Sequence, residues 1–138
     1  MGERKKAPLR PLQNQPAAGL RSGTDLIATA RVRRLLAENP GAWLGLTTPE
    51  ERLEWRGERA GACLLAAKEA VLKVLDVGAD EADWREIEVA VSPSCRLQFS
   101  GQLAQAAAAL GSGHWFCCTA AAADLAIAWV VWQPHARL

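Results

Sequence analysis

Residues 64–75 read LLAAKEAVLKVL, and this stretch decides the fold of the 138-residue chain. Alanine, leucine, lysine and glutamate all favour helix, and no proline or glycine interrupts the run. The leucines and valines surround most of the circumference of the helix, which predicts a buried central helix. Three charged side chains, Lys68, Glu69 and Lys73, are set into this apolar surface.

The charged residues of this helix allow two interpretations. Glu69 and Lys73 are one turn apart and share a face, with Cβ atoms roughly 6 Å apart. They can form an ordinary salt bridge along the one wet stripe of the helix. They can also belong to a binding site, because charges in an apolar environment are costly unless they are paired or meet a ligand or a metal.

Composition excludes several classes of function. Sixteen basic and 15 acidic residues give a net charge of +1, so bulk attraction of nucleic acid or membrane is not indicated. The four cysteines show neither C-x-x-C spacing nor a histidine at a zinc-finger offset, and their use fits a reducing compartment. No apolar run approaches the roughly 20 residues of a membrane helix. We expect a cytoplasmic protein without nucleic-acid or membrane partners.

The length is that of one domain with a sizeable core. Residues 1–18 are basic and contain prolines, so they are expected to form a flexible tail. Residues 19–133 form the single predicted domain, and residues 134–138 a polar C-terminal tail.

The segment before the central helix predicts a strand over 19–26 that turns directly into a helix over 26–38. Gly23 would permit close approach of another backbone. Asp25 would lie at the carboxyl end of the strand, where α/β junctions usually place ligands. Alternatively, Thr24 or Asp25 simply caps the helix.

Arg31 lies nearly two turns beyond Asp25, on a similar side of this predicted helix, while the other arginines of the helix are expected on a solvated face. Asn39-Pro40-Gly41 predicts its end. Thr48-Pro49-Glu50-Glu51 has the pattern of a capping box and predicts a short helix to about Trp55. The central helix is expected to end near Asp76, with Gly78 as its cap.

Beyond residue 84 the apolar period changes from helical to two. The patterns predict a hairpin of strands at 85–91 and 95–99 around a turn at 92–94, a helix at 101–110, and strands at 114–119 and 125–132.

Taken together, Gly23-Thr24-Asp25, Arg31, and the AAKEA motif of residues 66–70 followed by Lys73 resemble the holo-acyl-carrier-protein synthases, the short 4′-phosphopantetheinyl transferases. The resemblance covers roughly residues 19–132. It implies an α+β fold of the 4′-phosphopantetheinyl transferase type, with an antiparallel sheet packed on a central helix.

The resemblance also implies an enzyme and its site. Asp25 and Glu69 match the two carboxylates that hold Mg²⁺, a hard ion that prefers oxygen ligands. Lys73 joins them as a catalytic residue, and Lys68, Lys73 and Arg31 are expected to contact coenzyme A. The implied reaction is attack by a serine hydroxyl of an acyl (or peptidyl) carrier protein on the β-phosphorus of coenzyme A, which releases 3′,5′-ADP. The family further implies fatty acid or polyketide biosynthesis and a homotrimer, for which Trp129 and Trp132 are candidate interface anchors.

Several positions depart from the family pattern. Leu64-Leu65 replace an Arg-aromatic pair, and Pro93-Ser94-Cys95 replaces Gly-x-Pro. Residues 117–123 replace a segment with serines and a histidine, and Ala28 replaces an acidic residue. A second hypothesis therefore stays open, namely a non-catalytic or repurposed relative that binds a carrier protein or a biosynthetic partner.

Overall fold

The computed structural model describes residues 19–91 and 95–136. The expected tail at 1–18, the expected turn at 92–94 and the last two residues of the expected C-terminal tail lie outside the described residues. The elements follow in the order β1 (Arg21–Ala28), α1 (Thr29–Glu38), α2 (Pro40–Leu46), α3 (Pro49–Glu54), α4 (Glu58–Leu75), a 3₁₀ turn η1 (Trp84–Glu86), β2 (Ile87–Ala90), β3 (Arg96–Phe99), α5 (Gly101–Ala109), β4 (Gly113–Ala122) and β5 (Leu125–Pro134).

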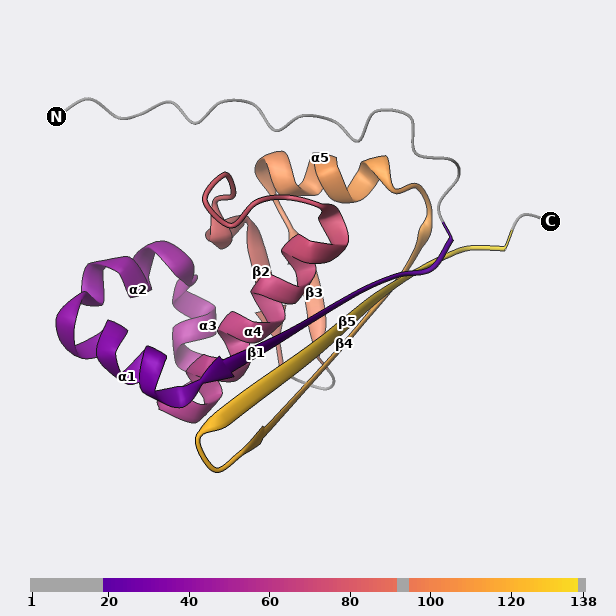
Figure 1. Ribbon diagram of the computed structural model, residues 1–138. Coiled ribbons are helices and arrows are strands. Elements are labelled where there is room, and N and C mark those ends of the chain that lie inside the picture. The colour runs from indigo at the N-terminus through magenta and orange to yellow at the C-terminus, as the bar shows by residue number, and fades with distance from the viewer. Residues whose placement is uncertain (1–18, 92–94, 137–138) are drawn as a thin grey trace, which may run out of the picture.

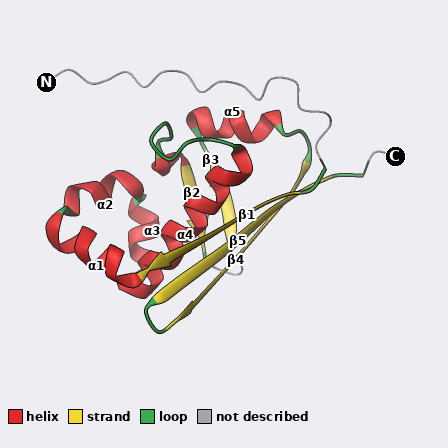
Figure 2. Ribbon diagram, viewed as in Figure 1, coloured by secondary structure: helices red, strands yellow, loops and turns green. Residues whose placement is uncertain are grey.

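A three-stranded antiparallel sheet, in the order β1-β5-β4, packs against α4. The strands run diagonally across the helix, while α1, α2 and α3 gather at one end of the molecule (Figure 1). β2 and β3 form a separate antiparallel hairpin, with α5 on the opposite side of the molecule from α1 (Figure 2). The predicted α+β class, with an antiparallel sheet on a central helix, is confirmed.

The core is built around α4, as its sequence predicts. Between Gly61 and Leu75 every side chain of α4 except those of Glu69 and Lys73 is buried. The facing surface comes from alternate positions of the sheet, since Ile27, Val130 and Trp132 are also buried. A helix that is apolar on nearly all sides needs partners all round, and the sheet, α1 and β2 supply them.

The predicted boundary between the first strand and the first helix is wrong. β1 continues to Ala28, which pairs with Leu125, and α1 begins only at Thr29. Asp25 is therefore an interior strand residue and caps no helix. Pairing along the whole of β5 explains the longer strand, because each added residue contributes to the ladder and places Ile27 in the core.

The predicted end of the first helix at residue 38 is confirmed, but the helix α2, the cap of α4 and the ends of the last two strands differ from the predictions. Asn39 ends α1 but also starts α2, because its side chain accepts a hydrogen bond from the backbone N–H of Ala42 and Pro40 occupies the first helical turn. α4 is capped by Asp76 itself, in the left-handed conformation, rather than by Gly78. β4 and β5 extend to a tight turn at 123–124, and β5 includes Pro134, the first residue of the expected tail. Among the described helices, none has both the length and the apolar character needed to cross a membrane.

Candidate functional site

A close approach between β1 and α4 creates the site. A Cβ atom at Gly23 would collide with the backbone carbonyl of Ala70, so only glycine lets the strand lie directly on the helix at this point. Two residues further along β1, on the same face, is Asp25. Next to Ala70 on α4 is Glu69. The expectation that Gly23 allows a close backbone approach is confirmed.

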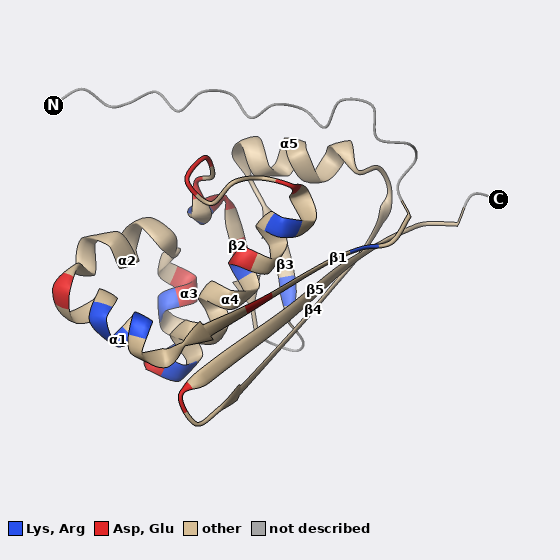
Figure 3. Cartoon of the chain, viewed as in Figure 1, with Lys and Arg blue, Asp and Glu red and all other residues tan. Residues whose placement is uncertain are grey.

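Lys73 joins β1 to α4. Its Nζ donates hydrogen bonds to the Oδ1 of Asp25 at 3.0 Å and to the backbone carbonyl of Thr24 at 2.7 Å. The Asp25 side chain is 15% exposed and the Lys73 side chain 54% exposed, so the carboxylate lies at the base of the site and the ammonium at its opening. Figure 3 shows an acidic segment of β1 where the strand passes α4.

Glu69 is the second carboxylate of the site. Its Oε1 accepts a hydrogen bond from the Nη2 of Arg31 at 3.4 Å, which brings α1 to the same place. The sequence also allows a salt bridge between Glu69 and Lys73. In the structure Glu69 pairs instead with Arg31 of α1, and Lys73 pairs with Asp25 of β1. The structure therefore brings Asp25, Glu69, Lys73 and Arg31 together.

The two carboxyl groups influence each other strongly. Burial, a hydrogen bond with Asp25 and the charge of Asp25 raise the pKa of Glu69 to about 7, against the opposing effect of Arg31. Burial also raises the pKa of Asp25, but hydrogen bonds with Glu69 and Lys73 outweigh it and hold that pKa below its usual value. Glu69 therefore keeps its proton to a much higher pH than an ordinary glutamate does.

This pair fits a bound cation. When Glu69 carries no proton, the buried Oδ2 atom of Asp25 has no hydrogen-bond partner, although such groups are nearly always satisfied. A cation between Asp25 and Glu69 would bind this oxygen and remove the repulsion that otherwise holds a proton on Glu69. In the described part of the chain no group of three or more Asp, Glu, His or Cys residues is placed to hold a metal, so a cation at this place would have two carboxylates as its protein ligands.

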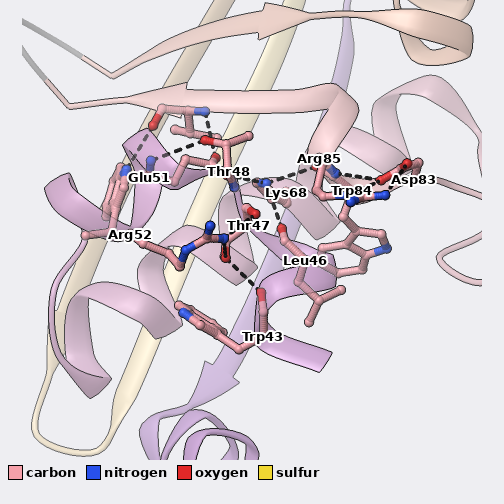
Figure 4. A network of polar contacts seen from close by, with 12 residues as sticks. Trp43, Leu46, Thr47, Thr48, Glu51, Arg52, Lys68, Asp83, Trp84 and Arg85 are labelled. Atoms are coloured by element: carbon pink, nitrogen blue, oxygen red, sulfur yellow. Dashed lines mark hydrogen bonds and ion pairs between the residues drawn. The ribbon is translucent and has the colours of Figure 1, made fainter. Parts of the chain in front are cut away.

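Lys68, for which a contact with coenzyme A is predicted, lies apart from these four residues. The side chain is fully buried, and Nζ forms an ion pair with Glu51 of α3. It also donates to the backbone carbonyls of Leu46, at 2.8 Å, and Trp84, at 2.9 Å (Figure 4). Its three protons therefore have three acceptors within the protein, which leaves none for a ligand.

Glu51 is predicted by the sequence only as a capping residue, and that prediction is confirmed. Its carboxylate accepts from the backbone N–H of Thr48, as the capping box requires, and also from the backbone N–H of Val89 on β2, both at 2.9 Å. One carboxylate thus holds α3, α4 and β2 together beneath the site. The Thr48-Pro49-Glu50-Glu51 pattern predicts the cap. No local signal predicts that Glu51 also pairs with Lys68, which lies 17 positions further along the chain.

A cavity of about 320 Å³ opens beside the site, between α1 and α4. It is lined by Arg31, Arg34, Leu35, Glu38, Asn39, Leu46, Leu65 and Trp84. Leu65 is one of the two leucines that depart from the family pattern, so this departure makes a wall of the cavity apolar.

The chain is similar in sequence to proteins of known identity over most of its length. No protein-family model matches the chain. The holo-[acyl-carrier-protein] synthase of Frankia alni is 38% identical over 112 residues, which cover 79% of this chain and 92% of the relative. The chain belongs to the holo-[acyl-carrier-protein] synthase family. The synthase of Alkaliphilus metalliredigens is 41% identical over 71 residues, which cover 49% of this chain and 58% of that protein.

Solved structures of synthases have the same fold. The apo-ACPS structure from Chronobacterium ammoniagenes has a TM-score of 0.77 and 21% identity, with 86% of this chain and 98% of that chain covered. The ACPS-CoA complex from the same organism has a TM-score of 0.76. The family resemblance, the enzyme class of phosphopantetheinyl transferases and the fold are thereby confirmed.

Proposed function

We propose that this synthase transfers the 4′-phosphopantetheine group of coenzyme A to a serine of an acyl carrier protein in a Mg²⁺-dependent reaction. The observation that carries the proposal is the facing pair Asp25 and Glu69, with Lys73 on one side and Arg31 on the other. The relatives named holo-[acyl-carrier-protein] synthase, and the ACPS-CoA complex of a protein with the same fold, support the choice of substrates.

Asp25 and Glu69 would hold the Mg²⁺. Two carboxylates are a usual protein contribution to such a site, since Mg²⁺ keeps several waters and binds substrate phosphate oxygens. When bound, the ion would neutralise charge on the pyrophosphate of coenzyme A, the chemistry on which phosphoryl transfer depends most.

Lys73 and Arg31 are suited to contact substrate phosphates. Their side chains are 54% and 56% exposed, and each is held by one carboxylate of the pair. With the two carboxylates engaged in holding the ion, the Lys73 ammonium and the Arg31 guanidinium would be available for charge-assisted hydrogen bonds to phosphate oxygens. The cavity beside Arg31 gives room for a part of coenzyme A. Because Lys68 is fully committed within the protein, we assign the phosphate contacts to Arg31 and Lys73.

Assembly as a homotrimer is part of the proposal. On the face of the sheet turned away from α4, the large apolar side chains of Leu26, Phe116, Ile127 and Trp129 are 47–59% exposed. Strand register places Leu26 beside Ile127, so the exposed groups are neighbours. A patch of this kind marks an association surface in soluble proteins. Trp132, the other predicted anchor, is wrong for this role because it is buried on the inner face. Fatty acid or polyketide biosynthesis stays a prediction from the family.

The test is the transfer reaction of wild type and Glu69→Gln. The substitution keeps the shape of the side chain but removes the charge that would hold the cation. We expect transfer to the carrier protein, measured by intact-protein mass, to fall at least ~100-fold at equal folded fraction by circular dichroism. Glu58→Gln is a matched control, because Glu58 also lies on α4 and pairs with an α1 arginine, Arg33 at 2.9 Å, but stands outside the site.

Equal transfer by wild type and Glu69→Gln would refute the proposed role of the carboxylate pair. A comparable loss of transfer in Glu58→Gln would show that breaking any ion pair between α1 and α4 is enough to lower the activity, and would also speak against a specific role of Glu69. The alternative of a non-catalytic relative predicts no transfer by the wild type, together with carrier-protein binding that survives Glu69→Gln.

A further inference from the structure

Two cysteines face each other at a junction between the two sheets. Cys95 directly precedes β3, and Cys117 lies in the middle of β4. Their Sγ atoms are 2.8 Å apart, in hydrogen-bond contact, and both thiols are free. β3 and β4 belong to separate sheets, so within the described residues no strand ladder joins them. The junction is held by side chains, including the rings of Phe99 and Trp115 with centroids 5.0 Å apart.

The pair is set apart from the other cysteines by its position. Cys63 is buried within α4, where burial raises the pKa of its thiol. Cys118 is exposed and points to the opposite face of β4 from Cys117, because side chains alternate along a strand. Among the described cysteines, Cys95 and Cys117 are the pair in direct thiol contact.

A small reagent can reach this pair. A cavity of about 750 Å³ is lined by residues 95–97 on one side and by residues 115–118 with Trp129 and Val131 on the other. Both thiols are half-buried rather than enclosed. Two lining residues of this cavity, Phe116 and Trp129, also belong to the proposed trimer contact. Cys117 itself shares the inner face of the sheet with Trp115, which packs on Phe99. Access of a reagent in the trimer therefore requires that assembly leave this part of the cavity open.

The two thiols are also unequal in acidity. The hydrogen bond with Cys117 lowers the pKa of Cys95 below its usual value, although burial opposes this. The same hydrogen bond, together with burial, raises the pKa of Cys117. Since the thiolate is the nucleophile in thiol–disulfide exchange, this direction favours Cys95 for the first attack and Cys117 for the second, although direct contact of the two sulfurs allows either order.

We propose that Cys95 and Cys117 are a reversible modification site, which forms an intrachain disulfide on reaction with a small-molecule disulfide. The Cys95 thiolate attacks one sulfur of the reagent, forms a mixed disulfide and releases the first thiolate. Cys117 then attacks the Cys95 sulfur, breaks the mixed disulfide and passes its proton to the second leaving thiolate. In total the two cysteines lose two electrons and two protons, and one reagent disulfide becomes two thiols. Neither residue belongs to the Asp25–Glu69 site, so this inference is independent of the proposed transfer reaction.

The link would tie the β2–β3 hairpin to the three-stranded sheet. The two positions are 22 residues apart in the chain, so the bond closes a loop of moderate length. Closing such a loop restricts the unfolded chain, and we expect oxidation to raise the thermal midpoint by roughly 5–10 °C.

The test uses the full-length reduced protein in native buffer with oxidised glutathione as the probe. The expected product is a monomeric chain lighter by two hydrogen atoms in intact-mass spectra, reversed by dithiothreitol. Peptide mapping after alkylation should assign the bond to Cys95 and Cys117. Cys118→Ser is the matched control and should form the same link. Cys95→Ser and Cys117→Ser should lose both the link and the increase in thermal midpoint.

Other products would overturn the proposal. These are a bond that maps to Cys118 or Cys63, a disulfide between two chains, a lasting glutathione adduct on Cys95, or no change in mass after hours of exposure. Because the first measurement is made on the wild type, a Ser variant that folds poorly leaves the wild-type result decisive. Circular dichroism of each variant in the reduced state checks its fold.

Discussion

Removal of the Lys68 ammonium tests whether the buried Glu51–Lys68 pair sustains the fold beneath the site. We expect Lys68→Met, which keeps most of the side-chain volume, to destabilise the protein strongly. Glu51 would remain fully buried with a charge and no cation, and the carbonyls of Leu46 and Trp84 would lose their donor. The hydrogen bonds of Glu51 to the backbone of Thr48 and Val89 would not compensate for the missing charge.

The magnitude follows from the burial of both partners. Both side chains are 0% exposed, so neither group can regain water without local opening. Removing one member of a buried pair costs about 3–5 kcal/mol, a large share of the roughly 5–15 kcal/mol that stabilises a typical domain. For a domain of this size we expect the thermal midpoint to fall by about 10–15 °C.

The assay is thermal and urea unfolding followed by circular dichroism, with the double variant Glu51→Gln/Lys68→Met as the decisive comparison. Removing both charges replaces the pair by neutral groups, so the double variant should recover most of the loss. A Lys68→Met midpoint within about 2 °C of wild type, or a double variant no more stable than the single one, would refute this reasoning.

The remaining predictions concern the site and the assembly. Gly23→Ala should strongly lower phosphopantetheine transfer while lowering the thermal midpoint only modestly, because the new Cβ must push β1 away from the carbonyl of Ala70. Gly19→Ala is the control, because a Cβ atom there meets no atom within 4 Å. Because the pKa of Glu69 is raised, its contribution to the stability of the metal-free protein is fully present below the ordinary pKa of 4.5 and is lost as the pH rises through about 7. Differential scanning calorimetry should therefore show a thermal midpoint that falls across this pH range. Glu69→Gln should not show this fall, and Mg²⁺ should make the fall smaller. Trp129→Glu should convert a trimer into monomers in analytical ultracentrifugation; a monomeric wild type at micromolar concentration would contradict the assembly.

The sequence predicts the fold best where one segment determines its own surroundings. The stretch 64–75 is apolar on nearly all sides, so a buried central helix follows from periodicity alone. The capping box at Thr48 is equally local, because each of its hydrogen bonds spans three residues. Asn39-Pro40 shows the limit of local patterns, since the same residues that end one helix are suited to begin another.

The site is predictable only in part, because the sequence does not show in which direction each charged side chain of α4 points. Asp25, Glu69, Lys73 and Arg31 meet, but the pairs that they form join different elements and depend on tertiary packing. Lys68 and Glu69 are adjacent, so on a helix they point about 100° apart, one toward α3 and the other toward α1 and β1. Which of the two faces the cleft could not be deduced from a helix that is apolar on every other side.

The alternation of β1 makes insertions more harmful than substitutions. Gly23 and Asp25 face α4 and belong to the site, while Leu26 faces outward with the apolar surface proposed for assembly. A substitution at one of these positions affects one face. A single residue inserted before Gly23 would instead shift the register of the following residues against β5, turn the Asp25 carboxylate outward and bring Thr24 to its place facing α4. We expect length changes in this strand to abolish catalysis and association together, so the spacing between the start of β1 and Asp25 is constrained by both.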